Sequence, residues 1–349
     1  MDRNFAINGF GRIGRLAFRI WYLYHRQEIN LAAINTSGSM TLEGWANLLK
    51  HDSTYRLFPG RIELEVHQTN RQITDNDPLL GHFILDGKLR IPVLAQRDPS
   101  KIPWKKYQVD LVIESTGVFR TLDKAKLHLH PNGANRVLIS APGKSDSITT
   151  LVKGVCESSQ GKVFSNASCT TNSIAPVMKV LLQEFGVAKA FLTTVHAYTD
   201  DQRLQDGSHR DLRRSRAAAQ NIVPTTTGAA IATTKVLPQL QNFAGLALRV
   251  PVITGSLSDI TAVLDREVTK DQLNQAFIKA SQTYLKDILG TTNEPLVSSD
   301  IIGNRHSSIV DLSLTSVVGG NLVKVVAWYD NEWGFTNRLL EMAGYLLSH

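Results

Sequence analysis

Two residues have the types and the surroundings of a catalytic thiol and its base. Cys169 stands in the small polar stretch Ser165-Asn-Ala-Ser-Cys-Thr-Thr-Asn172, before an apolar run at 174–182 that has the pattern of a helix. A thiol at a helix N-terminus has a lowered pKa, and the thiolate is its nucleophilic form. His196 ends a strand-like run and precedes a polar turn, so we expect it to pair with Cys169. Cys156 has no such surroundings, and we interpret it as a small buried apolar residue.

Three glycines near the start have the spacing of a dinucleotide-binding turn. Gly9, Gly11 and Gly14 follow a short apolar run and open a helical pattern, the context that makes G-x-G-x-x-G informative. The helix N-terminus would hold a pyrophosphate. The alternative is that the glycines serve only a strand-to-helix turn. Asn35 stands 21 residues after Gly14, where an NAD-specific site has an acidic residue on the ribose 2′-hydroxyl. A neutral amide does not repel a 2′-phosphate, so Asn35 argues against strict exclusion of NADP.

The elements that must position these residues fall into two groups. The first half contains buried-strand runs, each ending in a small-residue loop, at 5–8, 31–34, 109–113 and 136–139. From about residue 165 the pattern is mixed. Strand-like stretches lie at 191–198, 247–253, 260–264 and 323–329, and a helical pattern lies at 270–288. We therefore expect an α/β protein with a Rossmann-type dinucleotide-binding domain and an α+β catalytic domain with a mixed or antiparallel sheet. The expected domains are 1–168 and 169–333, with a C-terminal helix, 334–349, packing back on the first.

Length and composition exclude several classes of protein. The 349 residues are 42% hydrophobic and 20% charged, which argues against disorder and fits two domains. No stretch reaches the roughly 18 apolar residues of a membrane span, and the first residues lead straight into a strand-like run, so we expect neither a membrane segment nor a signal peptide. Two cysteines are too few for a disulfide framework or a four-thiolate zinc site. We expect a cytoplasmic protein without a bound metal.

The net charge of +7 favours an anionic partner. Five arginines lie between residues 203 and 216, and a catalytically idle nucleic-acid or protein-binding module is one interpretation of them. Such a module would interleave aromatic residues with the arginines for base stacking. Leu204 and Leu212 are the only large apolar residues there. We therefore expect a phosphorylated metabolite, and neither nucleic acid nor a membrane, as the partner.

Five motifs occur in the order that is typical of one enzyme family. They are Ile7-Asn-Gly-Phe-Gly-Arg-Ile-Gly-Arg15, Ser165-Asn-Ala-Ser-Cys-Thr-Thr-Asn172, His209-Arg-Asp-Leu-Arg-Arg214, Thr225-Thr-Thr-Gly-Ala-Ala230 and Trp328-Tyr-Asp-Asn-Glu332. Across essentially its whole length the chain resembles the phosphorylating glyceraldehyde-3-phosphate dehydrogenases. The resemblance implies a glycolytic oxidoreductase that converts D-glyceraldehyde 3-phosphate reversibly to 1,3-bisphosphoglycerate with NAD(P) and inorganic phosphate. Cys169 would form the thiohemiacetal and thioester, and His196 would lower the thiol pKa and take the hydroxyl proton.

The same resemblance implies two phosphate pockets and a cofactor site. The pocket for the substrate's phosphate would contain Thr199, Asp201 and Arg249. The pocket for inorganic phosphate would contain Ser168, Thr170, Arg214, Thr227 and Gly228. The cofactor would contact Gly9, Gly11, Arg12, Ile13, Gly14, Asn35, Arg97, Ser140, Ser208 and Asn331.

The resemblance also implies a homotetramer, in which segment 203–216 would be the long S-loop that lies between subunits near the cofactor. Ser208 stands where strict NAD users often carry Pro, and it is similar to the NADP-accepting photosynthetic type, in which Ser of the neighbouring subunit approaches the 2′-phosphate. Asn35 and Ser208 together favour dual or NADP-leaning cofactor use. Erythrose-4-phosphate dehydrogenase shares the cysteine block and the His209–Arg214 motif and is the alternative activity. Thr199 and Thr225–Ala229 resemble the triose enzyme.

Overall fold

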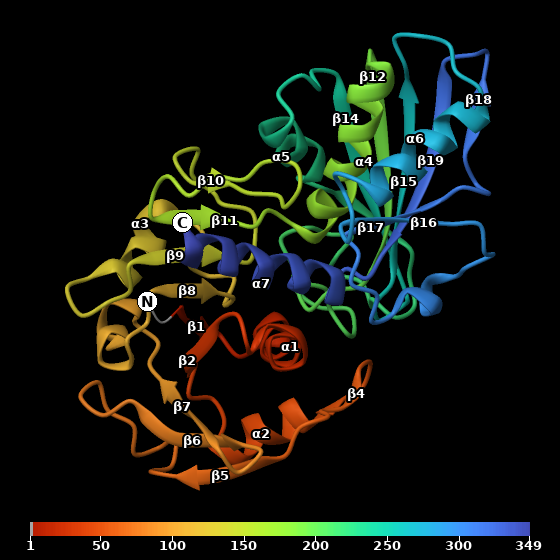
Figure 1. Ribbon diagram of the computed structural model, residues 1–349. Helices are drawn as coiled ribbons and strands as arrows, with labels where there is room; N and C mark the ends of the chain where they lie inside the picture. Colours follow the sequence, from red (N-terminus) through yellow and green to blue (C-terminus); the bar gives the residue numbers. More distant parts are fainter. Residues whose placement is uncertain (1–2) are drawn as a thin grey trace. The chain divides into compact units, whose positions relative to one another are not determined.

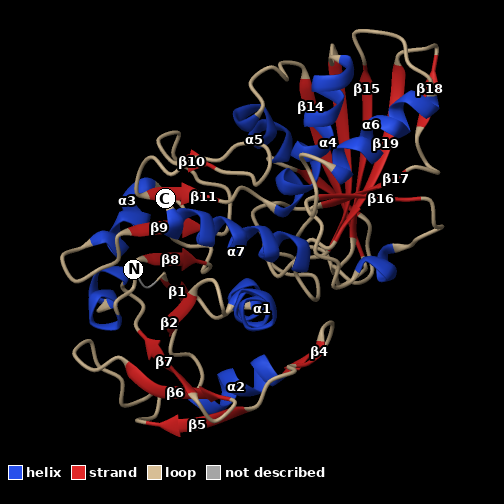
Figure 2. Cartoon of the chain, viewed as in Figure 1, coloured by secondary structure: helices blue, strands red, loops and turns tan. Residues whose placement is uncertain are grey.

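The computed structural model describes residues 3–349, and the chain divides into two compact units. The first unit runs to Leu151 and also takes in Ser158–Ala167 and Leu339–His349. The second unit consists of Val152–Glu157 and Ser168–Arg338. Each unit has its own sheet (Figures 1 and 2).

The sheet of the first unit has nine strands in the order β10-β11-β9-β8-β1-β2-β7-β6-β5. Strands from β10 to β7 are parallel to one another, and β6 and β5 continue the sheet in antiparallel pairing. Their bounds are β1 Asn4–Asn8, β2 Asn30–Thr36, β5 Ile62–Val66, β6 Leu79–Leu85, β7 Leu89–Ala95, β8 Leu111–Glu114, β9 Arg136–Ile139, β10 Thr149–Thr150 and β11 Val163–Ser165. This is the expected Rossmann-type arrangement, in which the ends of β1, β2 and β8 meet at one edge.

Helices of the first unit begin where the strands end. Helix α1 (Arg12–Ile20) starts directly after Gly11 and continues as a π-helical turn, Trp21–His25. Phe18 on α1 packs edge-on against Phe10 and Phe83, with ring centroids 6.0 and 6.3 Å away, and these rings form part of the core. The other helices and small strands are α2 Leu42–Lys50, β3 His51–Asp52, β4 Arg56–Leu57, 3₁₀ turns Pro99–Lys101 and Trp104–Tyr107, α3 Leu122–Ala125 and the 3₁₀ turn Lys126–Leu129.

The second unit has a mixed sheet in the order β13-β14-β12-β15-β19-β17-β16, with β18 paired to β19. The pairs β12–β14 and β16–β17 are parallel and the others antiparallel. The bounds are β12 Lys189–Ala197, β13 Val223–Thr226, β14 Phe243–Val250, β15 Ser256–Val263, β16 Leu289–Thr292, β17 Ser308–Asp311, β18 Ser316–Val318 and β19 Leu322–Tyr329. Along β15 every second residue is buried, because alternate side chains face opposite sides of a sheet.

Three helices complete the second unit: α4 Cys169–Phe185, α5 Ala229–Val236 and α6 Lys270–Gln282, with a 3₁₀ turn at Ser298–Ile301. Helix α4 packs against β15, β17 and β19 and against the other two helices. Helix α6 begins with a capping box, in which Thr269 and Gln272 bond to each other's backbone N–H groups. The packing of α4 holds its first turn at the end of the sheet that carries the candidate site.

Helix α7 (Trp333–Ser348) is the last element, and the boundary between the units falls within it, after Arg338. Its second half belongs to the first unit, where the carbonyl of Leu346 accepts a hydrogen bond from Arg136. None of the helices found in residues 3–349 is long and apolar enough to cross a membrane.

Candidate active site

Cys169 is the first residue of α4, at a sharp turn of the chain. Strand β11 ends at Ser165, and Ala167, which is not glycine, has a φ of +55° immediately before the helix. Ser168 is the N-cap, and its Oγ accepts the backbone N–H of Thr171 at 3.1 Å. The thiol therefore lies beside the first turn of a helix, where backbone N–H groups have no partner within the helix.

His196 reaches the thiol from β12, and the two side chains meet. The distance from Cys169 Sγ to His196 Nε2 is 3.3 Å. His196 Nδ1 lies 2.6 Å from the carbonyl oxygen of Ala197. For His196 to take the thiol proton at Nε2, Nδ1 must carry the hydrogen and donate it to that carbonyl. This tautomer holds the imidazole ring in place and leaves Nε2 facing sulfur.

Arg249 is the charged group nearest to this pair. It lies opposite His196 in the parallel register of β12 and β14. Its Nη1 is 2.8 Å from His196 Nδ1 and 3.2 Å from the oxygen of Ala197. A guanidinium N–H can only donate, so Arg249 opposes both a hydrogen on Nδ1 and a doubly protonated imidazole.

Burial and Arg249 determine the protonation of the pair. Burial, followed by the charge of Arg249, lowers the pKa of His196 to about 3. Burial raises the pKa of the Cys169 thiol, and Arg249 is the charge that opposes this rise. The expectation of a thiol pKa lowered by His196 is therefore wrong for the site as it stands, because loss of hydration is the larger effect. The arrangement is that of a neutral thiol next to a neutral base.

Tyr329 is a site residue that the sequence motifs did not single out. Its hydroxyl lies 3.0 Å from Thr170 Oγ1 and 2.9 Å from Thr194 Oγ1, and its ring packs edge-on against His196 at 6.0 Å. Burial raises the pKa of this phenol. Tyr329 thus ties the first turn of α4 to β12. Its place two residues before Asn331, in the last of the five motifs, was the available signal.

Arg214 and Asp201 form the second charged cluster of this unit. Arg214 Nη1 donates to Asp201 Oδ2 at 2.6 Å, and its Nε donates to Thr225 Oγ1 at 2.9 Å. The Thr199 hydroxyl donates to Asp201. These hydrogen bonds connect Arg214 to Asp201 and Thr199, which the family resemblance assigned to the other phosphate pocket. Hydrogen bonds from Thr199 and the charges of Arg214 and Arg249 hold the pKa of Asp201 below its usual range against the effect of burial.

The remaining phosphate candidates differ in how open they are. Ser168 Oγ serves as the helix cap, and the Thr170 hydroxyl is buried against Tyr329. Thr227 and Gly228 stand at the start of α5, where a Cβ placed on Gly228 would meet nothing within 4 Å. Arg249 Nε is buried and has no hydrogen-bond partner among residues 3–349. Open backbone and a guanidinium N–H without a protein partner are the features that an anion needs.

The arginine-rich segment 203–216 is braced by its own side chains. Arg203 Nε donates to the carbonyl of Ser208 at 2.8 Å, and Arg216 Nε donates to Asp206 at 2.7 Å. Leu204 is 85% exposed and Leu212 is 81% exposed. The segment is therefore ordered by polar contacts while it presents apolar side chains outward.

The glycine turn of the first unit fits a dinucleotide pyrophosphate. Gly9 has a φ of +94°, and a Cβ on Gly14 would lie 2.0 Å from the Gly9 carbonyl oxygen. These two glycines make the tight turn and the close packing possible. A Cβ on Gly11, the N-cap of α1, would meet no atom within 4 Å. Space over a helix N-terminus without an acidic first turn is what a phosphate group requires.

Three further candidates of the first unit lie at or near the same strand ends. Arg12 and Ile13 are the first two residues of α1, and Arg12 pairs with Asp52 and stacks over Tyr55 at 5.3 Å. Ser140 follows β9, and its N–H bonds to the carbonyl of Glu114 at 2.9 Å.

Asn331 lies in the second unit with its amide orientation set by neighbours. Its Oδ1 accepts the backbone N–H of Gly255 at 3.2 Å and the hydroxyl of Ser256 at 2.8 Å. Because a backbone N–H can only donate, the contacting atom is the oxygen. The structure gives Nδ2 no partner within residues 3–349, so Asn331 retains a donor for a carboxamide oxygen.

Asn35 does not have the position that its spacing predicted. It is 3% exposed, and its Nδ2 donates to Asn8 Oδ1 at 2.7 Å and to the Gln96 carbonyl at 2.8 Å. Its Oδ1 accepts the N–H of Gln96 at 2.9 Å. The side chain is buried with its Oδ1 and both amide hydrogens engaged, so Asn35 is not available to a ribose hydroxyl. The first exposed side chain after β2 is Ser37, whose carbonyl accepts Arg97 Nε at 3.0 Å.

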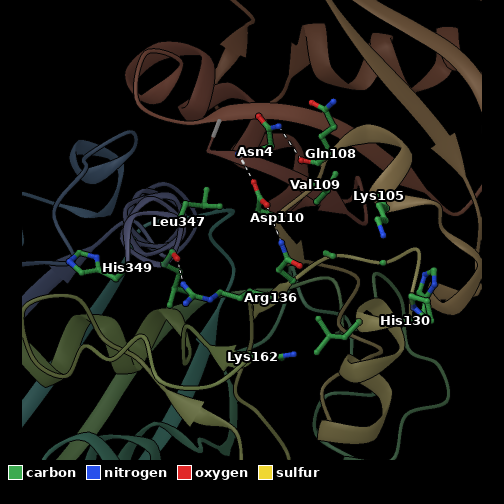
Figure 3. A pocket seen from close by; sticks show the side chains of 16 residues that line it. Asn4, Lys105, Gln108, Val109, Asp110, His130, Arg136, Lys162, Leu347 and His349 are labelled. Carbon is green, nitrogen blue, oxygen red and sulfur yellow. Dashed lines mark hydrogen bonds between the residues drawn. The ribbon is translucent and has the colours of Figure 1, made fainter. Parts of the chain in front are cut away.

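A cavity of about 740 Å³ lies elsewhere in the first unit, at the opposite ends of the strands (Figure 3). Its lining includes Asn4 and Arg136, the first residues of β1 and β9, and Asp110, which precedes β8. Ligands of open parallel sheets bind at the carboxyl ends of the strands. This cavity is therefore not part of the dinucleotide edge.

Comparison with known proteins agrees with both units. Residues 3–122 match the model of the glyceraldehyde 3-phosphate dehydrogenase NAD binding domain, and residues 168–331 match that of its C-terminal domain. The chain is 49% identical over 348 residues to glyceraldehyde-3-phosphate dehydrogenase of Thermotoga maritima, covering 98% of each chain. It is 49% identical over 347 residues to the Streptomyces coelicolor enzyme of that name, covering 98% of this chain and 97% of the relative.

A chloroplastic relative shows similar agreement. The chain is 46% identical over 342 residues to glyceraldehyde-3-phosphate dehydrogenase A, chloroplastic, of Chlamydomonas reinhardtii, covering 97% of this chain and 87% of the relative. Identity of this level over nearly the whole length leaves one conclusion: the chain belongs to the glyceraldehyde-3-phosphate dehydrogenase family.

Proposed function

We propose that this protein catalyses the reversible oxidative phosphorylation of D-glyceraldehyde 3-phosphate to 1,3-bisphosphoglycerate with NAD(P). The observation that carries the proposal is the 3.3 Å contact between Cys169 Sγ and His196 Nε2 at the start of α4. In this proposal the first unit binds the dinucleotide and the second carries out the chemistry on the aldehyde. Bound NAD(P) supplies the acceptor for the hydride.

Cys169 and His196 form and oxidise the covalent intermediate. Sγ attacks the aldehyde carbon, and the thiol proton passes by way of His196 Nε2 to the former carbonyl oxygen, which gives a thiohemiacetal. His196 then removes the hydroxyl proton as the carbon loses its hydride, and a thioester remains on Cys169. The lowered pKa of His196 leaves its Nε2 unprotonated and open to accept this proton. Inorganic phosphate attacks the thioester, releases the acyl phosphate and restores the thiol.

The two arginine clusters hold the two phosphate groups. Arg249 and the Thr199 hydroxyl bind the phosphate of the substrate, and Asp201, which accepts hydrogen bonds from Thr199 and Arg214, positions these donors. Arg214, with Thr227 and Gly228, binds inorganic phosphate at the start of α5, and Ser168 and Thr170 flank the thiol on that side. The planar guanidinium suits both because its fork of N–H groups matches phosphate oxygens. Asn331 Nδ2 donates to the carboxamide of the cofactor.

Cofactor use is dual or leans toward NADP. The stretch from Asn35 to Met40 that follows β2 contains no carboxylate, so nothing in it repels a 2′-phosphate. Arg97 uses Nε for the Ser37 carbonyl, and the rest of its exposed guanidinium and the exposed Ser37 hydroxyl are donors beside the same loop. Ser208, on the exposed segment 203–216, adds a hydroxyl from a neighbouring subunit.

The change Ser37→Asp tests cofactor preference. It places a carboxylate in the loop beside Arg97, and we expect the ratio of kcat/KM for NADP to that for NAD to fall at least about 10-fold. Ser348→Asp, at an exposed serine at the end of α7, is the control for an added carboxylate. A ratio that is unchanged in Ser37→Asp would contradict this part of the proposal.

We also propose a cytoplasmic homotetramer. The outward apolar side chains of segment 203–216, Leu204 and Leu212, support association of subunits there. Two cysteines that are both unpaired support a reducing compartment. Light scattering after size-exclusion chromatography measures the assembly, and a monomeric mass would contradict it.

Steady-state assays test the activity itself. Purified protein with D-glyceraldehyde 3-phosphate and NAD or NADP should reduce the dinucleotide in a phosphate-dependent manner, and Cys169→Ala should abolish this reduction. Erythrose 4-phosphate is assayed in parallel. A higher kcat/KM for erythrose 4-phosphate would overturn the assignment of substrate, and full activity of Cys169→Ala would overturn the mechanism.

A further inference from the structure

A chain of buried polar side chains joins the ends of three strands in the first unit, and the proposed mechanism uses none of them. Asn35, Asn8 and Glu114 are the last or next-to-last residues of β2, β1 and β8. His128 and Trp104 continue the chain beyond Glu114. All five side chains belong to residues that are at most 3% exposed.

The direction of each hydrogen bond is fixed from one end by a backbone group. The N–H of Gln96 donates to Asn35, so the atom it contacts is Oδ1 and the other end of the amide is Nδ2. Asn35 Nδ2 donates to Asn8 Oδ1 at 2.7 Å, and Asn8 Nδ2 therefore donates to Glu114 Oε2 at 2.5 Å. The N–H₂ groups of Asn35 and Asn8 therefore both point along the hydrogen-bonded network in the direction of Glu114.

The other end is fixed by an indole. Trp104 Nε1 is only a donor, and it lies 3.1 Å from His128 Nδ1, which must accept. The hydrogen of a neutral His128 is then on Nε2, and it is donated to Glu114 Oε2 at 3.0 Å. This half of the chain also directs its donors toward Glu114.

Thr116 supplies the remaining donors. Its backbone N–H donates to Glu114 Oε1 at 2.8 Å, and its hydroxyl donates to the same oxygen. The hydroxyl oxygen accepts the N–H of Val118, which is consistent with its hydrogen pointing at the carboxylate. Glu114 thus accepts four hydrogen bonds, from the Asn8 amide, the His128 ring, and the backbone N–H and hydroxyl of Thr116. Glu114 is a buried carboxyl group with both oxygens hydrogen-bonded.

The same contacts hold the glycine turn. A Cβ on Gly9 would lie 2.8 Å from both the N and the Cγ2 of Thr116, so Gly9 rests directly on the residue that Glu114 anchors. Ser115 Oγ donates to the Gly9 carbonyl at 2.7 Å, and Ser115 N–H donates to the Asn8 carbonyl at 2.8 Å. Glu114 therefore sets the position of the loop after β8, and that loop sets the position of the turn after β1.

We propose that Glu114 and His128 are positioning residues for the dinucleotide, acting through Thr116 and Ser115 on the glycine turn that receives the pyrophosphate. This inference rests on the proposed function, since it assigns a role within the cofactor site. Asn35 belongs to this network and acts on the cofactor only through Asn8 and Glu114. These buried side chains fix the shape of the glycine turn, and none of them needs to touch the dinucleotide.

The isosteric change Glu114→Gln tests the inference. In one orientation the glutamine amide turns its N–H₂ toward Asn8 Nδ2 and His128 Nε2–H, and in the other toward the backbone N–H of Thr116, so a donor faces a donor in both. We expect the Kd for NAD(P), measured by fluorescence titration, to rise at least about 10-fold. The KM for the aldehyde and the rate of Cys169 alkylation without dinucleotide should stay within about 2-fold of wild type, because the second unit keeps its own contacts.

His128 provides a paired test that does not depend on the folding of Glu114→Gln. His128→Gln keeps one donor for Glu114 and one acceptor for Trp104, whereas His128→Leu keeps neither. We expect the Kd of His128→Gln to lie near wild type and that of His128→Leu to rise about 10-fold. Glu28→Gln is the matched control, because Glu28 also pairs with a histidine, His25 at 2.9 Å, but its side chain is 64% exposed.

The outcomes separate this inference from the proposed function. Wild-type protein that binds neither NAD nor NADP would contradict the proposed function. Wild-type binding together with unchanged Kd in Glu114→Gln or in His128→Leu would overturn the inference alone. A loss in which aldehyde KM and alkylation rate change as much as the Kd would also overturn it, because that pattern indicates general destabilisation.

Discussion

The two units treat their polar side chains in opposite ways. At the strand ends of the first unit, Asn35, Asn8 and Glu114 are saturated by one another and by the backbone. In the second unit Arg249 keeps a buried Nε without a partner among residues 3–349, and Cys169 contacts His196 without an ion pair. A saturated network maintains the shape of a binding turn. An unsaturated one keeps the capacity to bind anions and to move protons, at a cost in stability.

The strongest test of this contrast is His196→Gln. The change removes the base from the unsaturated site, so we expect kcat to fall by about 10²- to 10⁴-fold. Dinucleotide binding, which the first unit provides, should remain. Stopped-flow measurement of reduced cofactor gives kcat, and fluorescence titration gives the Kd. A fall in kcat of less than about 10-fold would contradict the role of His196 as base.

The glycine turn permits a comparison within the first unit. In Gly14→Ala the new Cβ would lie 2.0 Å from the Gly9 carbonyl oxygen, so we expect a loss of unfolding free energy of about 1–3 kcal/mol. Gly11→Ala meets no protein atom within 4 Å and should fold normally, but its methyl group occupies the space for the pyrophosphate. We expect its Kd for dinucleotide to rise about 10-fold.

Urea denaturation and cofactor titration of both variants measure the two effects. If Gly11→Ala lost stability while its affinity remained unchanged, the interpretation of that open space would be wrong.

The pH dependence of stability reports on the buried imidazole. The pKa of His196 is lowered from its ordinary value of 6.5 to about 3, so the folded state disfavours the protonated form. Stability is therefore fully present above the unfolded pKa and declines as the pH falls toward 3. Between pH 7 and pH 5 we expect His196 to account for a loss of about 1–2 kcal/mol.

Urea titrations at pH 7 and pH 5 compare wild type with His196→Gln, which should lose less stability on acidification. His67→Gln, at a side chain that is 50% exposed, is the control. Equal losses in wild type and His196→Gln would show that the imidazole is not responsible.

The smallest effect is expected for Tyr329→Phe. It removes the hydroxyl between Thr170 and Thr194 but keeps the ring against His196, so we expect a loss of about 1 kcal/mol in stability and a fall in kcat of several fold. Tyr345→Phe, on α7 of the first unit, is the control for loss of a phenol. If Tyr329→Phe had wild-type kcat, Tyr329 would be only a packing residue.

The sequence predicted which segments form helices and strands better than it predicted the residues at which they begin and end. Strand 109–113 was expected, and β8 begins at Leu111 because the N–H of Val109 bonds back to the Trp104 carbonyl. Helix 270–288 was expected, and α6 ends at Gln282. There the Leu285 N–H bonds to the Ala280 carbonyl and Asp287 adopts a φ of +64°, so the chain leaves the helix in tight turns. The spacing of apolar residues does not show where such turn hydrogen bonds replace those of a helix or strand.

The candidate site was predictable where a residue acts through its own motif. Cys169 and the glycines follow from the residues around them, whereas the contact of Cys169 with His196 depends on how α4 packs on β12's sheet. Asn35 was misjudged because spacing counts residues and not side-chain directions, and β2 is buried on both faces at its end. Glu114 and His128 were missed because their function depends on partners far apart in the chain.

Ala167 has a consequence for attempts to make the protein more heat-resistant. A non-glycine residue with a φ of +55° stores roughly 1 kcal/mol of strain, and Ala167 does so two positions before the sulfur. Glycine there would relieve that strain in the native state, yet it would also loosen the corner that aims Cys169 along the start of its helix. The methyl group of Ala167 therefore lowers the stability of the fold while it helps to fix the position of the Cys169 thiol.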